Sequence, residues 1–198
     1  RTLRAALTLE LEFHGHDDLG LATANTLAAI RGGATHASVC ILGLGERAGN
    51  AALEEVVACL DCFSGRKSNV DLAQLPRLAE LVATASRRLI SPGKSIVGAS
   101  AFTHESGIHV DGLIKDPRTY EELSPHTFGR QRTIVLGKHS GTASVANALR
   151  ALGLAANEIE MRLLLKQVQA RSIEAKRTVS TEELLEFYVQ IAEANCNS

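Results

Sequence analysis

The chain has 198 residues, of which 45% are hydrophobic and 22% are charged, so it has enough apolar material for an ordinary globular core. Lysine and arginine number 21 against 22 aspartate and glutamate residues. This balance argues against nucleic acid as a partner, because phosphate binding draws on a clustered excess of basic side chains. The sequence has no run of about 18 apolar residues, so it predicts no membrane-spanning helix.

The cysteines and the first residues bear on the compartment. Four cysteines are too few and too unevenly spaced for a disulfide framework, which favours a reducing compartment and a cytoplasmic location. Residues 1 to 6 show neither a secretory signal nor an initiator methionine. We therefore expect the sequence to be a piece of a longer protein.

The front of the chain alternates between strand and helix patterns. Residues 7 to 13 alternate apolar and polar side chains with a period of two, which predicts a strand, and residues 21 to 30 predict an alanine-rich helix. A second apolar run at residues 37 to 42 predicts a buried strand, and an apolar stripe over residues 53 to 63 predicts a helix. This order indicates a βαβα unit with parallel strands.

The pattern changes after residue 64. Residues 72 to 90 predict one amphipathic helix, whereas residues 91 to 141 are rich in glycine, serine, histidine and proline and predict a long loop region of functional importance. Three more helices are predicted at residues 142–152, 156–175 and 181–194, the last opened by a Ser180-x-x-Glu183 capping box.

The predicted organisation has three parts, which are residues 1–64, 65–141 and 142–198. Two strands alone do not form a stable sheet with both faces covered, so the first part needs a missing partner. We expect the isolated chain to expose strand edges.

Two histidines end the first predicted strand. His14 and His16 are two residues apart, so on a strand their imidazoles point the same way and are able to share one ion. Ligands bind where the strands of parallel sheets end, which favours a metal site here. Asp17 and Asp18 follow directly and are candidates to orient the imidazoles. The alternative of two structural histidines stays open.

A glycine-rich loop follows the second predicted strand. Its glycines at positions 43, 45 and 49 are spaced GxGxxxG rather than GxGxxG, and a charged pair inside the loop would crowd a pyrophosphate, so dinucleotide binding is disfavoured. We expect the loop to present Asn50 to the site that the histidines face, since neighbouring parallel strands end about 5 Å apart.

A third segment, residues 102 to 112 with Tyr120, holds an unusual density of groups that transfer protons, among them His104 and His109. A polar loop that hydrogen-bonds to itself would have the same composition, and this alternative stays open. Cys59 and Cys62 lie in an apolar predicted helix and are interpreted as small core residues.

The three segments in this order resemble one enzyme family, the metal-dependent Claisen-condensing acyltransferases, which comprise 2-isopropylmalate, citramalate and homocitrate synthases. The resemblance covers almost the whole chain. The motifs that carry it are His14-Gly15-His16-Asp17-Asp18-Leu19-Gly20-Leu21-Ala22-Thr23-Ala24-Asn25, Gly43-x-Gly45-Glu46-Arg47-x-Gly49-Asn50, and His104-x-Ser106-Gly107-Ile108-His109-x-Asp111-Gly112.

Within the family, Asp17 and the run Gly33-Ala34-Thr35-His36 look most like homocitrate synthase of the nitrogen-fixation type. The chain departs from the family pattern before the glycine-rich loop, where Val39, Cys40 and Leu42 replace the Thr, Thr and Asn often found there. The departure bears on the keto acid rather than on the reaction.

The resemblance implies an α/β fold in which this chain supplies the C-terminal two β/α units of a (β/α)8 TIM barrel, followed by mainly helical linker subdomains. Family members begin with an Arg-Asp-Gly-Glu motif, which supplies a metal-binding acid and an arginine for the keto-acid carboxylate, and this motif does not occur in the sequence. The resemblance therefore implies a fragment, or one subunit of a split enzyme.

The resemblance also implies the site residues. His14, His16 and Asn50 would hold a divalent metal cation (Mg, Mn or Zn) together with an acid from the missing half. His109 and Tyr120 would be the catalytic proton relay at the methyl group of acetyl-CoA, the co-substrate. In relatives the loop that carries this relay reaches into the barrel of the other subunit, so we expect either a homodimer with loop exchange or a partner chain that supplies the N-terminal barrel half.

The implied reaction condenses acetyl-CoA with 2-oxoglutarate and water to give homocitrate and CoA, and homocitrate serves the nitrogenase iron–molybdenum cofactor. Two alternatives remain open. One is 2-isopropylmalate synthase, which acts on 2-oxoisovalerate in leucine biosynthesis, and the other is a non-catalytic metal-binding interaction subunit. We expect the chain alone to be inactive.

Overall fold

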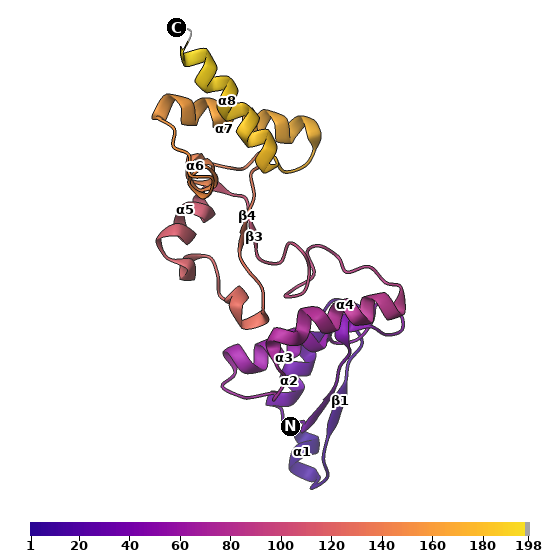
Figure 1. Ribbon diagram of the computed structural model, residues 1–198. Helices are drawn as coiled ribbons and strands as arrows, with labels where there is room; N and C mark the ends of the chain where they lie inside the picture. The colour runs from indigo at the N-terminus through magenta and orange to yellow at the C-terminus, as the bar shows by residue number, and fades with distance from the viewer. Residues whose placement is uncertain (197–198) are drawn as a thin grey trace. The chain divides into compact units, whose positions relative to one another are not determined.

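A computed structural model describes residues 1–196 (Figure 1). The chain divides into two compact units. Unit 1 comprises Arg1–Phe102 and Leu123–Gln131, and unit 2 comprises Thr103–Glu122 and Arg132–Ser198. The predicted three-part division at residues 64 and 141 stays a prediction.

Unit 1 contains two strands, four α-helices and three short 3₁₀ helices within the described part of the chain. In chain order they are α1 (Thr2–Ala6), β1 (Glu12–His14), α2 (Ala22–Arg31), β2 (His36–Ser38), η1 (Ile41–Gly43), α3 (Leu53–Phe63), η2 (Leu72–Gln74), α4 (Leu75–Ser86) and η4 (Pro125–Phe128).

The two strands of unit 1 run parallel, with Phe13 opposite Ala37 and His14 opposite Ser38. Helix α2 connects them and contacts both strands, and it also packs against α3 (Figure 1). Parallel strands joined by a helix confirm the predicted α/β class and the βαβα order. The number of barrel units to which these strands belong stays a prediction.

The first strand is shorter than its alternating pattern predicts. Regular pairing covers only Glu12–His14, and Leu7 and Leu9 are 39% and 68% exposed. Pairing with the second strand reaches back only to Leu11, whose carbonyl accepts hydrogen bonds from the N–H groups of Thr35 and His36. A strand requires a neighbour for its backbone groups, and residues 7 to 10 lack one within the described part of the chain, so their alternation has nothing to pack against.

The second strand also ends early. It covers His36–Ser38, and the chain then turns through η1, in which Leu42 adopts a left-handed backbone conformation with φ of 59°. This turn directs the chain into the glycine-rich loop. The predicted extension of the strand to residue 42 is therefore wrong.

The main core of unit 1 forms between α3, α4 and two segments that follow them. Leu75 and Ala79 of α4 are buried against Val57 of α3, and the rings of Phe102 and Phe128 stack with centroids 6.0 Å apart. The predicted helix over residues 72 to 90 begins as η2 and ends at Ser86, because the next residue, Arg87, is left-handed.

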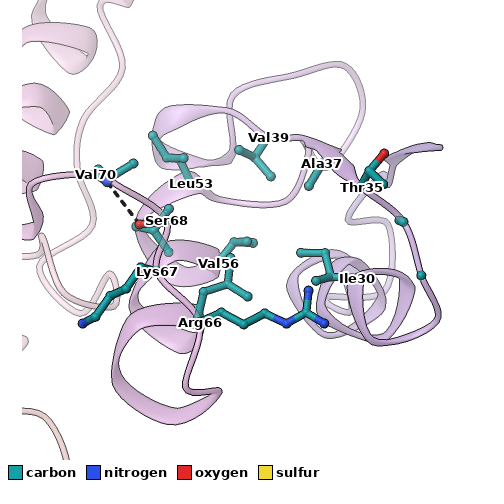
Figure 2. A pocket seen from close by; sticks show the side chains of 14 residues that line it. Ile30, Thr35, Ala37, Val39, Leu53, Val56, Arg66, Lys67, Ser68 and Val70 are labelled. Atoms are coloured by element: carbon teal, nitrogen blue, oxygen red, sulfur yellow. Dashed lines mark hydrogen bonds between the residues drawn. The ribbon is translucent and has the colours of Figure 1, made fainter. Parts of the chain in front are cut away.

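A separate hollow of about 600 Å³ lies among α2, β2 and α3 (Figure 2). Ile30, Val39 and Val56 point into it, and the exposed residues Arg66 and Lys67 also line it. None of the predicted site residues lines this hollow. The candidate site of unit 1 is therefore elsewhere.

The cysteines of α3 do not share one environment. Cys59 is half-buried, whereas Cys62 is exposed, and both are free thiols. Burial raises the pKa of the Cys59 thiol, with a further contribution from the negative charge of Glu55. The interpretation of both residues as core residues is thus wrong for Cys62.

Unit 2 contains two short strands, four α-helices and one 3₁₀ helix within its described residues. These are β3 (Thr103–His104), α5 (Gly107–Lys115), η3 (Pro117–Thr119), β4 (Thr133–Ile134), α6 (Thr142–Ala151), α7 (Glu158–Ala175) and α8 (Thr181–Cys196). The strands pair in parallel, and α6, α7 and α8 share a core around Val145, Leu164 and Leu184.

The three C-terminal helices confirm the helical prediction, including its capping box. The Ser180 hydroxyl accepts a hydrogen bond from the Glu183 N–H at 3.3 Å, and the Glu183 carboxylate accepts one from the Ser180 N–H at 3.0 Å. The loop prediction for residues 91 to 141 is wrong over α5, which buries Val110 and Leu113 three residues apart on one face. None of the helices described in residues 1–196 has the length and hydrophobicity needed to cross a bilayer.

Candidate functional site

The two histidines of the first motif lie side by side in unit 1. His14 ends β1, and its Nδ1 lies 3.2 Å from the Ser38 hydroxyl of β2. The ring of His16 follows two residues later, with its centroid 4.9 Å from that of His14 and its plane turned by 87°. The rings are near enough for one nitrogen of each to reach a common ion.

The glycine-rich loop places Asn50 next to His16. The two residues form an antiparallel bridge, and the flanking backbone is joined by hydrogen bonds from Ala51 N–H to Gly15 C=O at 3.2 Å and from Asp17 N–H to Gly49 C=O at 2.9 Å. The sequence predicted that Asn50 faces the histidines. The structure brings these three residues together.

Local contacts determine how the Asn50 amide is turned. Its Nδ2 donates to the Leu44 carbonyl at 2.9 Å and to the Cys40 sulfur at 3.3 Å, which directs Oδ1 away from those partners. A side chain at Gly45 would place its Cβ 2.5 Å from this Nδ2, so only glycine fits there. The glycine spacing of the loop thus serves the asparagine rather than a pyrophosphate.

Two polar atoms of this cluster are buried and unpaired. The His16 Nδ1 and the Asn50 Oδ1 have no hydrogen-bond partner among the residues that the structure describes. A buried polar atom without a partner is costly, and an imidazole nitrogen and an amide oxygen are both ligands that divalent cations accept. These residues therefore fit the metal that the first motif predicts.

The cluster does not form a complete ligand set within the described chain. Residues 1–196 contain no group of three or more His, Cys, Asp or Glu side chains arranged to hold a metal ion. The two histidines and the asparagine amount to part of a coordination sphere, which needs at least one further ligand.

The aspartates of the first motif have other partners. Asp17 accepts a hydrogen bond from the Ala22 N–H at 2.8 Å, at the start of α2, and Asp18 pairs with Arg47 through two nitrogens. The hydrogen bond from Arg47 holds the pKa of Asp18 below its ordinary value. Asp17 thus caps the start of α2, and Asp18 joins the histidine loop to the glycine-rich loop.

The predicted proton-transfer pair lies in unit 2. His109 is exposed on α5, and Tyr120 follows η3, with ring centroids 4.3 Å apart and planes tilted by 33°. Gly112 lies under the tyrosine, because a Cβ there would be 2.5 Å from its Cε2 atom. Two residues that are eleven positions apart therefore form one pair, held by the turn at residues 116 to 119.

A buried ion cluster anchors the segment that carries Tyr120. The carboxylate of Glu121, 5% exposed, accepts hydrogen bonds from Arg132 at 2.6 and 2.5 Å, and its Oε1 lies 3.2 Å from the His104 Nε2. The Arg132 hydrogen bond, despite partial opposition from burial, holds the pKa of Glu121 below its ordinary value. Sequence reasoning missed Glu121 and Arg132, because an ion pair eleven residues apart in an irregular segment has no periodic signal.

We expect Glu121→Gln to destabilise the protein by about 2 kcal/mol at pH 7, because it leaves a partly buried guanidinium without its counter-charge. The folded-state pKa of Glu121 is lowered, so its contribution is present above the unfolded pKa and is lost as the pH falls through the folded one. Urea unfolding of both proteins from pH 7 to pH 3 should therefore show the difference shrinking below about pH 4. Glu122→Gln, at the exposed neighbouring position, is the matched control; equal effects of the two substitutions would contradict a specific role for Glu121.

Comparison with known proteins finds a family match for two parts of the chain. Residues 1–82 match the HMGL-like family, and residues 96–176 match the family described as homocitrate synthase post-HMGL domain-like. The chain has an HMGL-like part followed by a homocitrate synthase post-HMGL part. This arrangement fits the 2-isopropylmalate, homocitrate and citramalate synthases, which are its relatives.

Individual relatives of this synthase family match most of the chain. It is 44% identical over 191 residues to 2-isopropylmalate synthase 2 of Caldanaerobacter subterraneus, which covers 96% of this chain and 50% of that protein. It is 46% identical over 185 residues to homocitrate synthase 1 of Nostoc sp., covering 93% and 49%. It is 50% identical over 142 residues to homocitrate synthase of Frankia alni, covering 72% and 40%. The chain thus spans about half the length of the first curated relatives that it matches.

Proposed function

We propose that this chain is the carboxyl-terminal part of a synthase that condenses acetyl-CoA with 2-oxoglutarate to give homocitrate and CoA. The observation that carries the proposal is the cluster of His14, His16 and Asn50, in which two buried ligand atoms lack a partner within the described residues. The homocitrate synthase post-HMGL match over residues 96–176 supports the choice of product. Homocitrate made in this way would serve nitrogenase iron–molybdenum cofactor synthesis.

His14, His16 and Asn50 would hold a divalent cation, with a further acidic ligand from the barrel half that the resemblance implies. When bound, the cation polarises the ketone of the 2-oxo acid. The Ser38 hydroxyl beside His14 and the backbone bonds around Asn50 keep these ligands in place before the substrate arrives.

His109 and Tyr120 would handle the proton that leaves the methyl group of acetyl-CoA. Imidazole and phenol groups both accept and donate protons, and the ring packing over Gly112 holds them as a pair. The resulting carbon nucleophile attacks the ketone, and water then cleaves the thioester, so that CoA leaves as the thiol. We further propose that this relay acts in the barrel of a second subunit or a partner chain.

The alternative activity, 2-isopropylmalate synthesis, has its own support. The chain is 44% identical to a 2-isopropylmalate synthase and 46% identical to a homocitrate synthase over similar lengths, so overall identity does not separate the two substrates. Cys40, one of the three residues that replace the usual Thr, Thr and Asn, accepts a hydrogen bond from the Asn50 Nδ2 at 3.3 Å, so this replacement lies where it would affect the choice of keto acid.

A direct comparison of substrates tests the proposal. In the assembled enzyme that contains this chain, thiol release from acetyl-CoA should be faster with 2-oxoglutarate than with 2-oxoisovalerate, by about 100-fold or more in kcat/KM, because a site that pairs with a second carboxylate rejects an apolar side chain. Preference for the branched acid would replace the homocitrate assignment with the alternative. Thiol release with neither acid, in a folded and metal-loaded assembly, would favour the non-catalytic interaction subunit.

A further inference from the structure

A cluster of ionisable side chains that the motifs do not include lies in unit 1, at the first turn of α3. The Glu54 side chain of α3 is fully buried, and those of Glu55 and Lys94 are only about a quarter exposed. The Lys94 ammonium lies 2.5 Å from Glu55 Oε1 and 3.5 Å from Glu54 Oε1. The Thr23 hydroxyl of α2 donates to Glu55 Oε2 at 2.8 Å.

The charges in this cluster are held in place by one another. Burial raises the pKa of Glu55, but hydrogen bonds from Lys94 and Thr23 lower it by more, so the pKa lies below its ordinary value. Burial lowers the pKa of Lys94, but the hydrogen bonds and negative charges of Glu55 and Glu54 together raise it by more, and the net direction is upward. The Lys94 ammonium is nearer to Glu55 than to Glu54, and the second oxygen of Glu54, Oε2, makes a different contact.

That contact is with the backbone of the turn that precedes the glycine-rich loop. The Glu54 Oε2 accepts a hydrogen bond from the Leu42 N–H at 3.1 Å. Leu42 has φ of 59°, a left-handed conformation that is unfavourable for a residue with a side chain. The hydrogen bond from this N–H to the buried Glu54 carboxylate offsets the unfavourable backbone energy and holds the turn in that conformation.

The turn at Leu42 also determines where Asn50 lies. Gly43, directly after Leu42, accepts a hydrogen bond from the Asn50 N–H at 2.9 Å through its carbonyl, and Cys40, two residues before Leu42, accepts one from the Leu53 N–H at 2.9 Å. Asn50, at the end of the glycine-rich loop, and Leu53, just after it, are thus hydrogen-bonded to residues on either side of Leu42. A shift at Leu42 would move the Asn50 Oδ1 relative to His16.

We propose that Glu54 is a positioning residue for the metal centre. Its buried carboxylate fixes the Leu42 turn and thereby holds the Asn50 amide beside His16. This inference rests on the metal-dependent function proposed above, and it assigns a role to a residue of α3 that does not itself touch the cation. Glu55, one residue further on, binds Lys94 and Thr23 and has no contact with the loop among the described hydrogen bonds, so its role is to neutralise Lys94 and join α2 to α3.

Metal affinity in the assembled protein tests the role of Glu54, with Mn²⁺ as the probe and electron paramagnetic resonance of free Mn²⁺ as the readout. Glu54→Met fills the buried space without an acceptor and is expected to weaken Mn²⁺ binding by about 10- to 100-fold, the loss typical of residues that hold metal ligands. Glu54→Gln retains an oxygen acceptor for the Leu42 N–H and should bind Mn²⁺ within about threefold of the parent. Glu54→Asp keeps the charge but withdraws the acceptor by one methylene, so it should lose affinity as Glu54→Met does.

The matched control is Glu55→Gln, which alters the neighbouring carboxylate and should leave Mn²⁺ affinity unchanged. Unchanged affinity in Glu54→Met, or equal losses in the Glu54 and Glu55 variants, would overturn the proposal. If Glu54→Met does not fold, Glu54→Asp decides, and affinity equal to that of the parent refutes the positioning role. His16→Ala is measured alongside: if it too binds Mn²⁺ normally, the metal centre itself is wrong, whereas a loss confined to His16→Ala refutes only the role of Glu54.

Discussion

Replacing His16 with alanine is expected to weaken Mn²⁺ binding by more than about 100-fold, because the substitution removes a ligand outright and not only a group that supports one. The imidazole Nδ1 of His16 is buried without a hydrogen-bond partner in the described structure, so no other protein contact competes for it. Titration of the assembled protein with Mn²⁺, followed by electron paramagnetic resonance, measures the change. His14→Ala should act in the same direction, since its ring centroid lies only 4.9 Å away.

The control for the metal site is His36→Ala. His36 is an exposed histidine at the start of β2, in the same unit, and its Nδ1 lies 3.0 Å from the Thr35 hydroxyl. Like His16→Ala, the His36→Ala substitution removes one imidazole from the protein, but it should leave Mn²⁺ affinity unchanged. Equal affinity in His16→Ala and His36→Ala would show that the adjacent rings do not bind metal.

The second large effect concerns His109. We expect His109→Ala to lower kcat by about 10² to 10⁴-fold, the range that general acid–base catalysis contributes, while Mn²⁺ affinity stays unchanged. Affinity should persist because His109 belongs to unit 2, whereas His14, His16 and Asn50 belong to unit 1. Steady-state thiol release from acetyl-CoA and the metal titration, performed on the same preparation, separate the two properties.

Two further variants show whether the loss is chemical. Lys115→Ala alters an exposed side chain of the same helix, paired only with Asp111 in the described contacts, and should retain full turnover. Tyr120→Phe preserves the ring that packs against His109 but removes the hydroxyl, so a loss of turnover there would assign the phenol to the proton relay. Near-normal turnover in His109→Ala would mean that α5 has a structural role alone.

The local parts of the fold follow from the sequence. The helices α2, α3, α6, α7 and α8 and the reciprocal bonds of Ser180 and Glu183 depend mainly on neighbours three or four residues away, which a sequence displays directly. The length of β1 depends on how far β2 extends, and the alternation over residues 7 to 13 contains no information about that partner. Helix α5 escaped prediction because Gly107 and Gly112 weaken its helical pattern, and the buried pair Val110 and Leu113 stabilises it only through tertiary contacts.

The same distinction holds for the site. The convergence of His14, His16 and Asn50 was predictable, because parallel strands and their following loops meet at one edge. The contacts that hold these three side chains in place could not be predicted. The bond from Leu42 to Glu54 and the pairing of Arg132 with Glu121 join residues eleven or twelve positions apart through irregular backbone, where no spacing rule applies.

The chain passes from unit 1 to unit 2, back to unit 1 and again to unit 2, and this order limits where it can be divided into fragments. Phe128 is fully buried in the core of unit 1 and stacks on Phe102, yet residues 103 to 122, which lie between them in the sequence, belong to unit 2. No single truncation can therefore separate the units cleanly. A fragment that ends after Phe102 would lose the buried Phe128 ring from its core. A fragment that begins at Thr103 would contain Phe128 without the core that buries it. Expression of either unit alone therefore requires that residues 123–131 be joined to unit 1 and removed from unit 2.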